Sequence, residues 1–142
     1  MERAYMEAYG GGCACGEVRY RAMTMPLLSL HCQCRDCQRI TGAGHASMMV
    51  FRASKVRLTG SLIYYETQAD SGNKGTRGVC AQCGSFIMAK SSGYPDVLWL
   101  TAGGLDEPSR FKPSCVVFAK SGHGWDYIDP ALTVFQQMPP SK

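Results

Sequence analysis

Eight cysteines in four groups are the feature that most constrains how this 142-residue chain can fold. They form C-x-C at Cys13 and Cys15, C-x-C-x-x-C at Cys32, Cys34 and Cys37, C-x-x-C at Cys80 and Cys83, and an isolated Cys115. The N-terminal sequence MERAYMEAYGGG has no apolar signal region, and no stretch approaches the roughly 20 apolar residues of a membrane span. We therefore expect a cytoplasmic protein without a membrane partner. Thiols stay reduced in that compartment, which favours metal binding or catalysis over a disulfide framework.

The rest of the sequence predicts a small, mostly β fold in a single domain covering residues 1–142. Its 16 glycines and 7 prolines favour turns and short elements. Alternating or apolar runs predict strands at residues 17–22, 27–31, 47–51, 56–58, 62–65, 86–89, 97–101 and 116–119. A short helix is predicted at residues 35–41, closed by Gly42. Residues 1–10 are expected to form a loosely ordered N-terminal segment.

Two of the cysteine pairs together offer the ligands of a closed structural zinc site. The C-x-x-C-G turn lets the sulfurs of Cys80 and Cys83 converge, and the alternation of side chains along a strand puts Cys13 and Cys15 on one side. Four thiolates are the complement of a tetrahedral Zn²⁺. Such a site would fasten the N-terminal strand to the middle of the chain and contribute folding free energy. Spacing alone also allows the first pair to join the middle group instead.

The middle group offers only three thiolates, Cys32, Cys34 and Cys37, from one short stretch. Three protein ligands and an exchangeable fourth position distinguish catalytic zinc from structural zinc. A fourth ligand from elsewhere would instead make both sites structural, and the candidates are Cys115, His31, His45 and His123. A redox dithiol is a further interpretation, but the βαβ context of thioredoxin-like motifs is absent. A lone cysteine beside two valines, such as Cys115, is expected to be a small buried apolar residue.

The formal charge of +4 does not indicate a nucleic-acid partner. Seven thiolates bound to two zinc ions would remove most of this surplus, and no run of Lys and Arg is present. If the chain assembles, a homodimer is the expected form, because two-fold dimers are the commonest oligomers.

Several motifs, in order along the chain, carry a resemblance to a known family. They are GGCACGEVRY (11–20), HCQCRDCQRITG (31–42), GSLIYY (60–65), RGVCAQCGS (77–85), LTAGGLDEP (100–108), KPSCVVF (112–118) and WDYID (125–129). From about Gly11 to Pro140, the chain resembles the glutathione-dependent formaldehyde-activating (GFA) enzymes. Three cysteine groups in this order and in these frames are a specific signal, whereas a single C-x-x-C is not.

The resemblance implies a β-tent fold, which is small, mostly β and stapled by zinc, with two zinc ions per chain. By position, Cys13, Cys15, Cys80 and Cys83 match the family's structural zinc site, and Cys32, Cys34 and Cys37 match its catalytic one. The implied activity is that of a carbon–sulfur lyase run in either direction, which joins glutathione or a similar thiol to a small aldehyde.

Two arginines near the cysteine groups, Arg39 and Arg77, are candidates to hold the carboxylates of a thiol substrate. The main departure from the family pattern is Val116, which stands where relatives often carry His. The rival interpretation is a non-catalytic zinc module that binds a partner and has two structural metal sites, because fold alone does not settle activity.

Overall fold

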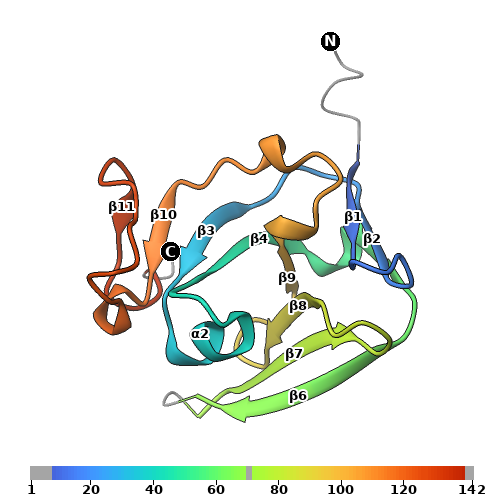
Figure 1. Ribbon diagram of the computed structural model, residues 1–142, viewed down its shortest axis with the longest axis horizontal. Helices are drawn as coiled ribbons and strands as arrows, with labels where there is room; N and C mark the ends of the chain where they lie inside the picture. Colours follow the sequence, from blue (N-terminus) through green and yellow to red (C-terminus); the bar gives the residue numbers. More distant parts are fainter. Residues whose placement is uncertain (1–7, 70–71, 140–142) are drawn as a thin grey trace.

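The computed structural model describes residues 8–69 and 72–139, which form two β-sheets and a short α-helix (Figure 1). The strands are β1 (Tyr9–Gly12), β2 (Arg19–Ala22), β3 (Leu28–Cys32), β4 (Ala46–Arg52), β5 (Val56–Thr59), β6 (Leu62–Gln68), β7 (Lys74–Cys80), β8 (Phe86–Ser91), β9 (Val97–Thr101), β10 (Cys115–Val117) and β11 (Thr133–Val134). The helix is α2 (Arg35–Thr41), and 3₁₀ turns span Ala53–Lys55, Ala102–Gly104, Pro108–Arg110 and Ala119–Ser121. The predicted mostly β, single-domain fold is confirmed. No helix in the described ranges is long and apolar enough to cross a membrane.

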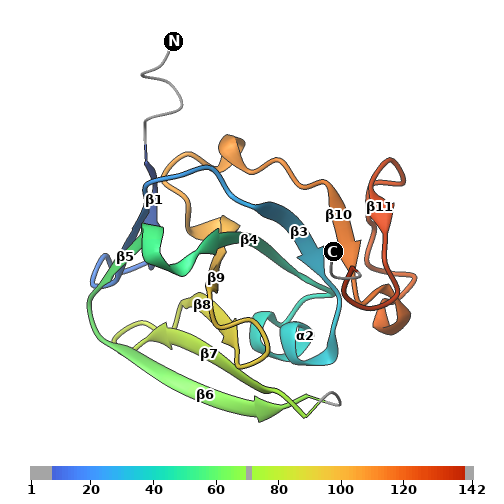
Figure 2. The same cartoon turned by 180° about the vertical axis from the view of Figure 1, so that it is seen from behind.

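The larger sheet has the strand order β11-β10-β3-β4-β9-β8-β7-β6, and the smaller sheet has the order β1-β2-β5. Pairing is antiparallel from β3 to β6, whereas β10 runs parallel to both β3 and β11. In Figures 1 and 2, α2 follows the end of β3 and precedes the start of β4, and it lies between these two strands and β7. This places a helix that follows β3 next to a strand about forty residues further along the chain.

Two apolar clusters cover opposite faces of the large sheet. The first packs the small sheet, through Tyr20 and Ala22, against Met49, Phe51 and Leu100 of the large one. The second is formed by the alternate residues of β3, β4 and β10, and its members include Leu30, Cys32, Met48, Cys115 and Val117. Because side chains alternate along each strand, one sheet supplies both clusters. Cys32 and Cys37 belong to the second cluster.

The predicted elements are largely found, with informative differences at their ends. The predicted helix at 35–41 matches α2, and Gly42 adopts the left-handed conformation (φ 72°) that closes it. The strand predicted at 17–22 begins at Arg19, because Val18 closes the preceding loop through two hydrogen bonds with Cys13. The strand predicted at 116–119 is wrong at its C-terminal end. It ends at Val117, since Phe118 has φ 57° and cannot continue a strand.

Three strands were not predicted: β1, β7 and β11. The first two are rich in glycine, which is depleted in strands and gives no apolar alternation. In β7, position 78 has no room for a side chain, because a Cβ at Gly78 would come within 3 Å of Met88 and Leu62. As for the expected loose segment at 1–10, residues 1–7 lie outside the described part of the chain, and Tyr9 and Gly10 belong to β1.

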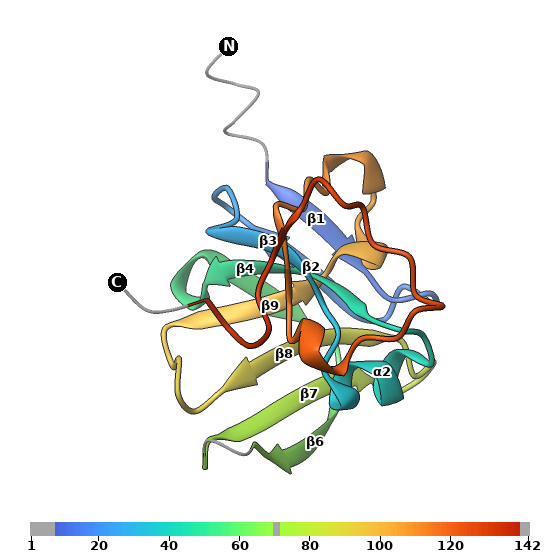
Figure 3. The same cartoon turned by 90° about the vertical axis from the view of Figure 1, so that its left-hand side faces the viewer.

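The C-terminal segment crosses back over β3 and α2, as Figure 3 shows. Asp126 accepts one hydrogen bond from Gln33 Nε2 (3.1 Å) and contacts His45 Nδ1 (2.9 Å), and it packs against the backbone of Gly44. These contacts lower the pKa of Asp126 against the opposing effect of its burial. The segment thereby fixes both the approach to α2 and the loop that follows it.

Replacement of Gly11 by Ala should destabilise the protein by about 1–3 kcal/mol, the usual cost of overpacking a core. A Cβ at Gly11 would overlap the carbonyl oxygen of Gly104 and the phenol of Tyr20, and that phenol is held by its bond to the Thr101 carbonyl (2.8 Å). The free energy of unfolding from denaturant titration measures the effect. Gly103→Ala is the matched control, because a Cβ there meets nothing within 4 Å. Equal stability of the two variants would contradict this account of the packing.

Candidate metal centres

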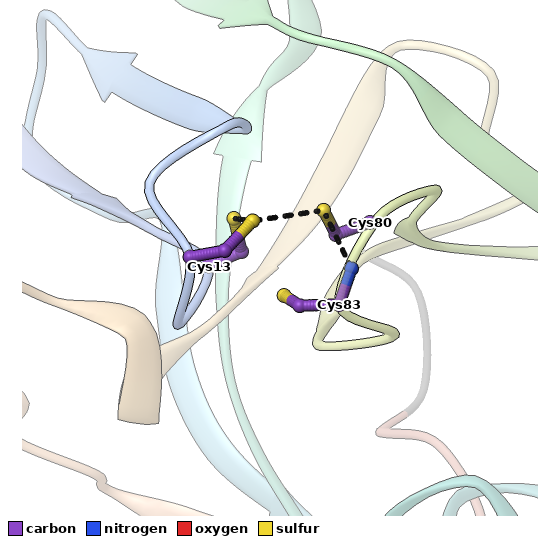
Figure 4. Close-up of side chains that lie close together, drawn as sticks. Cys13, Cys80 and Cys83 are labelled. Carbon is purple, nitrogen blue, oxygen red and sulfur yellow. Dashed lines mark hydrogen bonds between the residues drawn. The ribbon is translucent and has the colours of Figure 1, made fainter.

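The first centre joins two hairpins that are distant in sequence. Cys13 and Cys15 lie in the turn between β1 and β2, so the expectation that strand alternation places them on one side is wrong. Cys80 ends β7, and Cys83 lies in the turn before β8. Figure 4 shows the side chains of Cys13, Cys80 and Cys83 converging on one point. All four sulfurs lie within 4.8 Å of one another, and the Cys13–Cys15 and Cys15–Cys80 sulfur separations are 3.6 and 3.8 Å.

These separations fit a tetrahedral zinc ion. A Zn–S bond of about 2.3 Å implies about 3.8 Å between sulfurs on the corners of a tetrahedron, whereas a disulfide requires about 2 Å. All eight cysteines of the chain are free thiols. The four-sulfur group can therefore hold a metal ion.

Donors around the first centre favour ionised sulfur. The backbone N–H of Val18 donates to Cys13 Sγ (3.2 Å), and those of Gln82 and Cys83 donate to Cys80 Sγ (both 3.4 Å). The bond from Val18 lowers the pKa of Cys13. The hydroxyl and backbone of Ser85 lower the pKa of Cys83 to about 5. The turns thus supply the hydrogen bonds that zinc thiolates require.

The second centre comes from one short stretch at the start of α2. Cys32 ends β3, Cys34 is the N-cap residue of α2, and Cys37 lies in its first turn. Their sulfurs lie within 4.8 Å of one another. The backbone N–H of Cys37 donates to Cys34 Sγ (3.3 Å). Cys32 and Cys37 are buried, whereas Cys34 is partly exposed, so Cys34 is the member of the group with most access to solvent.

The three thiols of this triad (Cys32, Cys34 and Cys37) cannot all ionise unaided. The bonds from Cys32 and Cys37 lower the pKa of Cys34 to about 2. The bonds with Cys34 and Cys37, together with burial, raise the pKa of Cys32 well above its usual value. One thiolate is therefore stabilised by two protonated neighbours. Ionisation of all three sulfurs requires a cation among them, which is the chemistry of a divalent metal site.

Gln38 holds α2, and with it the triad, in position, and no motif or spacing in the sequence singles it out. The side chain is buried and donates from Nε2 to the carbonyl oxygens of Gln33 (2.8 Å) and Ser121 (2.9 Å). Its Oε1 contacts Arg35 and His123. These bonds tie α2 to the end of β3 and to the C-terminal segment. A polar residue beside the cysteines looks like any exposed helix residue until the fold buries it.

Of the two arginine candidates, the structure brings one to the triad. The Nη2 of Arg77 lies 3.9 Å from Cys34 Sγ and 3.8 Å from Cys37 Sγ. Burial lowers the pKa of Arg77, and the neighbouring sulfurs more than offset this effect. Arg39 is exposed in the last turn of α2.

The four residues considered as a fourth ligand of the triad are hydrogen-bonded elsewhere or packed among apolar side chains. His31 bonds to Ser47 (2.8 Å), His45 to Asp126 (2.9 Å) and His123 to Gln38 (2.9 Å), while Cys115 packs among apolar side chains. Throughout the described ranges, no further His, Cys, Asp or Glu ligand atom joins the three sulfurs within 4.8 Å.

The departure at Val116 lies away from the triad. Val116 is buried and pairs in register with His31, whereas its neighbour Val117 pairs with Cys32. Adjacent residues of a strand face opposite sides, so Val116 lies on the face opposite Cys32. Valine at this position therefore removes no polar group from beside the three sulfurs.

Comparisons with known proteins agree with this geometry. The family described as "Glutathione-dependent formaldehyde-activating enzyme" matches residues 8–121. Among curated proteins, none matches. A crystal structure of a Rhodobacter sphaeroides protein, a structural-genomics target, is similar with a TM-score of 0.57 at 16% identity, covering 89% of this chain and 98% of that one. At this identity the likeness supports the fold alone. The match over most of its length shows that the chain belongs to the glutathione-dependent formaldehyde-activating enzyme family.

Proposed function

We propose that this protein is a zinc-dependent carbon–sulfur lyase or synthase that joins, or releases, a glutathione-like thiol and a small aldehyde. One observation carries the proposal: the sulfurs of Cys32, Cys34 and Cys37 lie within 4.8 Å of one another, Cys34 is partly exposed, and no fourth protein ligand within the described residues completes the set. A metal site with three protein ligands leaves room for a substrate atom. Membership of the family supports the same class of reaction.

The triad would act through the substrate thiol. Zinc bound by the three sulfurs would hold that thiol as its thiolate, because a coordinating thiol is deprotonated. In the synthetic direction a sulfur–carbon bond forms at the carbonyl carbon, and the carbonyl oxygen takes up a proton to become a hydroxyl. The role of Cys32, Cys34 and Cys37 is to hold the centre in place. The hydrogen bonds of Gln38 to the carbonyl oxygens of Gln33 and Ser121 would hold α2 in place around this centre.

The four-sulfur centre has a structural role in this proposal. Cys13 and Cys15 lie in the turn that joins two strands of the small sheet, whereas Cys80 ends β7 of the large sheet and Cys83 lies in the turn that follows it. A metal ion there cross-links the two sheets and contributes folding free energy. It also fixes the end of β7, the strand that carries Arg77.

The carboxylates of a glutathione-like substrate need a cation close to the triad. Arg39 is exposed on α2, but two residues after Cys37 it lies on a different side of the helix from that cysteine, so its contact with a substrate carboxylate stays a proposal. The proposal also includes a cytoplasmic location, where eight thiols stay reduced, and a homodimer as the form in which the chain would assemble.

Metal analysis of the purified protein should find two zinc ions per chain. Cys34→Ser should lose one ion and still unfold cooperatively. Cys83→Ser should lose the other ion and become markedly less stable, since that site links two hairpins. Cys115→Ala is the control and should keep both ions, because Cys115 lies among apolar residues. Loss of an ion from Cys115→Ala would instead make Cys115 a ligand.

Glutathione at millimolar concentration should change the thiolate-to-metal absorption of the protein loaded with Co²⁺. A substrate sulfur that enters the fourth position alters the ligand field. The protein should also accelerate the formation of the hydroxymethyl adduct of glutathione from formaldehyde, followed by exchange NMR. Cys34→Ser should lose both effects, and Cys115→Ala should keep them. Two bound ions with no response to the thiol would support the non-catalytic zinc module instead.

A further inference from the structure

We propose that Arg77 is a positioning residue that balances the negative charge of the Cys32, Cys34 and Cys37 sulfurs, so that the triad accepts a fourth, anionic sulfur. The identity of that fourth ligand rests on the proposed function. The charge balance itself does not, because it concerns residues of this chain alone.

The register of the large sheet directs Arg77 toward the triad. A single row of paired residues runs across six strands on the face of the second apolar cluster: Leu28, Val50, Trp99, Ala89, Arg77 and Tyr65. The first four of these residues pack in the cluster that contains Cys32 and Cys37. A guanidinium in a row that is otherwise apolar or aromatic is costly unless an anion meets it.

The head group of Arg77 is held by the sulfurs and by one hydroxyl. Nη2 contacts both Cys34 and Cys37, and Nη1 donates to Thr67 Oγ1 (3.4 Å). Thr67 pairs with Gly75 in the adjacent strand, and a Cβ at Gly75 would lie 3.3 Å from Thr67 Oγ1 and 3.5 Å from Arg77 Nη1. The glycine therefore leaves room for this contact.

No carboxylate forms an ion pair with Arg77 among the described residues. Asp36 acts on it only at longer range, and the Nε is buried without a hydrogen-bond partner. Truncating one partner of a buried charge pair is strongly destabilising because it leaves the other charge uncompensated. The thiolates of the triad are thus the anions that this cation requires.

The consequence for ligand binding is electrostatic. A divalent ion and three thiolates together carry one net negative charge, and a fourth thiolate would make it two. Repulsion between like charges is strong in a partly buried site. The guanidinium of Arg77 offsets one charge and, with Nη2 bonded to the sulfurs, draws electron density from them. In this assignment Arg77 serves the thiolates, and its covered Nε leaves it poorly placed to bind a substrate carboxylate.

The test compares Arg77→Gln and Arg77→Lys with Lys90→Gln, all loaded with Co²⁺. Lys90 is the matched control because it is exposed on the adjacent strand β8 and pairs with Thr76, and because Lys90→Gln removes the same single positive charge as Arg77→Gln. Two quantities are measured: the affinity of the triad for Co²⁺ by chelator competition, and the glutathione affinity from the thiolate-to-metal band. Arg77→Gln should weaken each by about tenfold or more, in the range found when outer partners of metal ligands are removed. It should also shift the band.

Arg77→Lys should recover part of both affinities, because it restores the charge without the two-sulfur contact. Thr67→Val removes only the hydrogen-bond partner of Nη1, so it should weaken both affinities by less than Arg77→Gln does. It replaces Arg77→Gln as the test variant if that variant does not fold. An unchanged band and unchanged affinities in Arg77→Gln would overturn the proposal while leaving the proposed function in place. If glutathione leaves the thiolate-to-metal band of the wild-type protein unchanged, the proposed function is overturned. Weaker Co²⁺ binding by Arg77→Gln in the same experiment would still support the charge balance.

Discussion

Repulsion between crowded sulfurs is the constraint on which the structure depends. Two groups of cysteines bring their sulfurs within 4.8 Å of one another, and the cost of ionising neighbours at such separations is large. The fold offsets this electrostatic cost with different groups at the two sites. Four sulfurs at the first match the corners of a tetrahedron and receive backbone N–H donors. Three sulfurs at the second lie beside the half-buried Arg77, and Cys34 is the partly exposed member of the three.

The difference between the centres follows from how each is built. The four-sulfur centre uses turns from two sheets, so its geometry is tied to the tertiary fold as a whole. The triad uses the end of β3 and the first turn of α2, and its rigidity comes from polar bonds to Gln38 and from the C-terminal segment. A centre built locally can change its outer ligand without loosening the sheets. That separation suits a structural role for the first and chemistry at the second.

The sequence predicted the elements whose signals are local. The apolar runs of β3, β4 and β9 and the helix between Cys34 and Gly42 all emerged from periodicity and turn residues. The strand β7 did not, because Gly78 is required by the packing of Met88 and Leu62, which no local pattern reveals. Long-range polar contacts, such as Asp126 with His45 and Gln38 with Ser121, were likewise beyond reach. The approach of Arg77 to the sulfurs depended on a strand register that spacing alone cannot supply.

One strand serves both centres, and the spacing along it has a consequence for how the chain can vary. Arg77 faces the apolar cluster of the triad, while Cys80, an odd number of positions further on, packs in the cluster on the other side. The pairing of β7 with β8 shifts register between Gly78 and Val79, where it skips Ile87 of β8, whereas the pairing of β7 with β6 is regular over the same residues. Substitutions can alter either end of this strand independently. An insertion or deletion of a single residue between them would turn one end of the strand to the opposite face relative to the other, so the two centres together constrain the length of this segment.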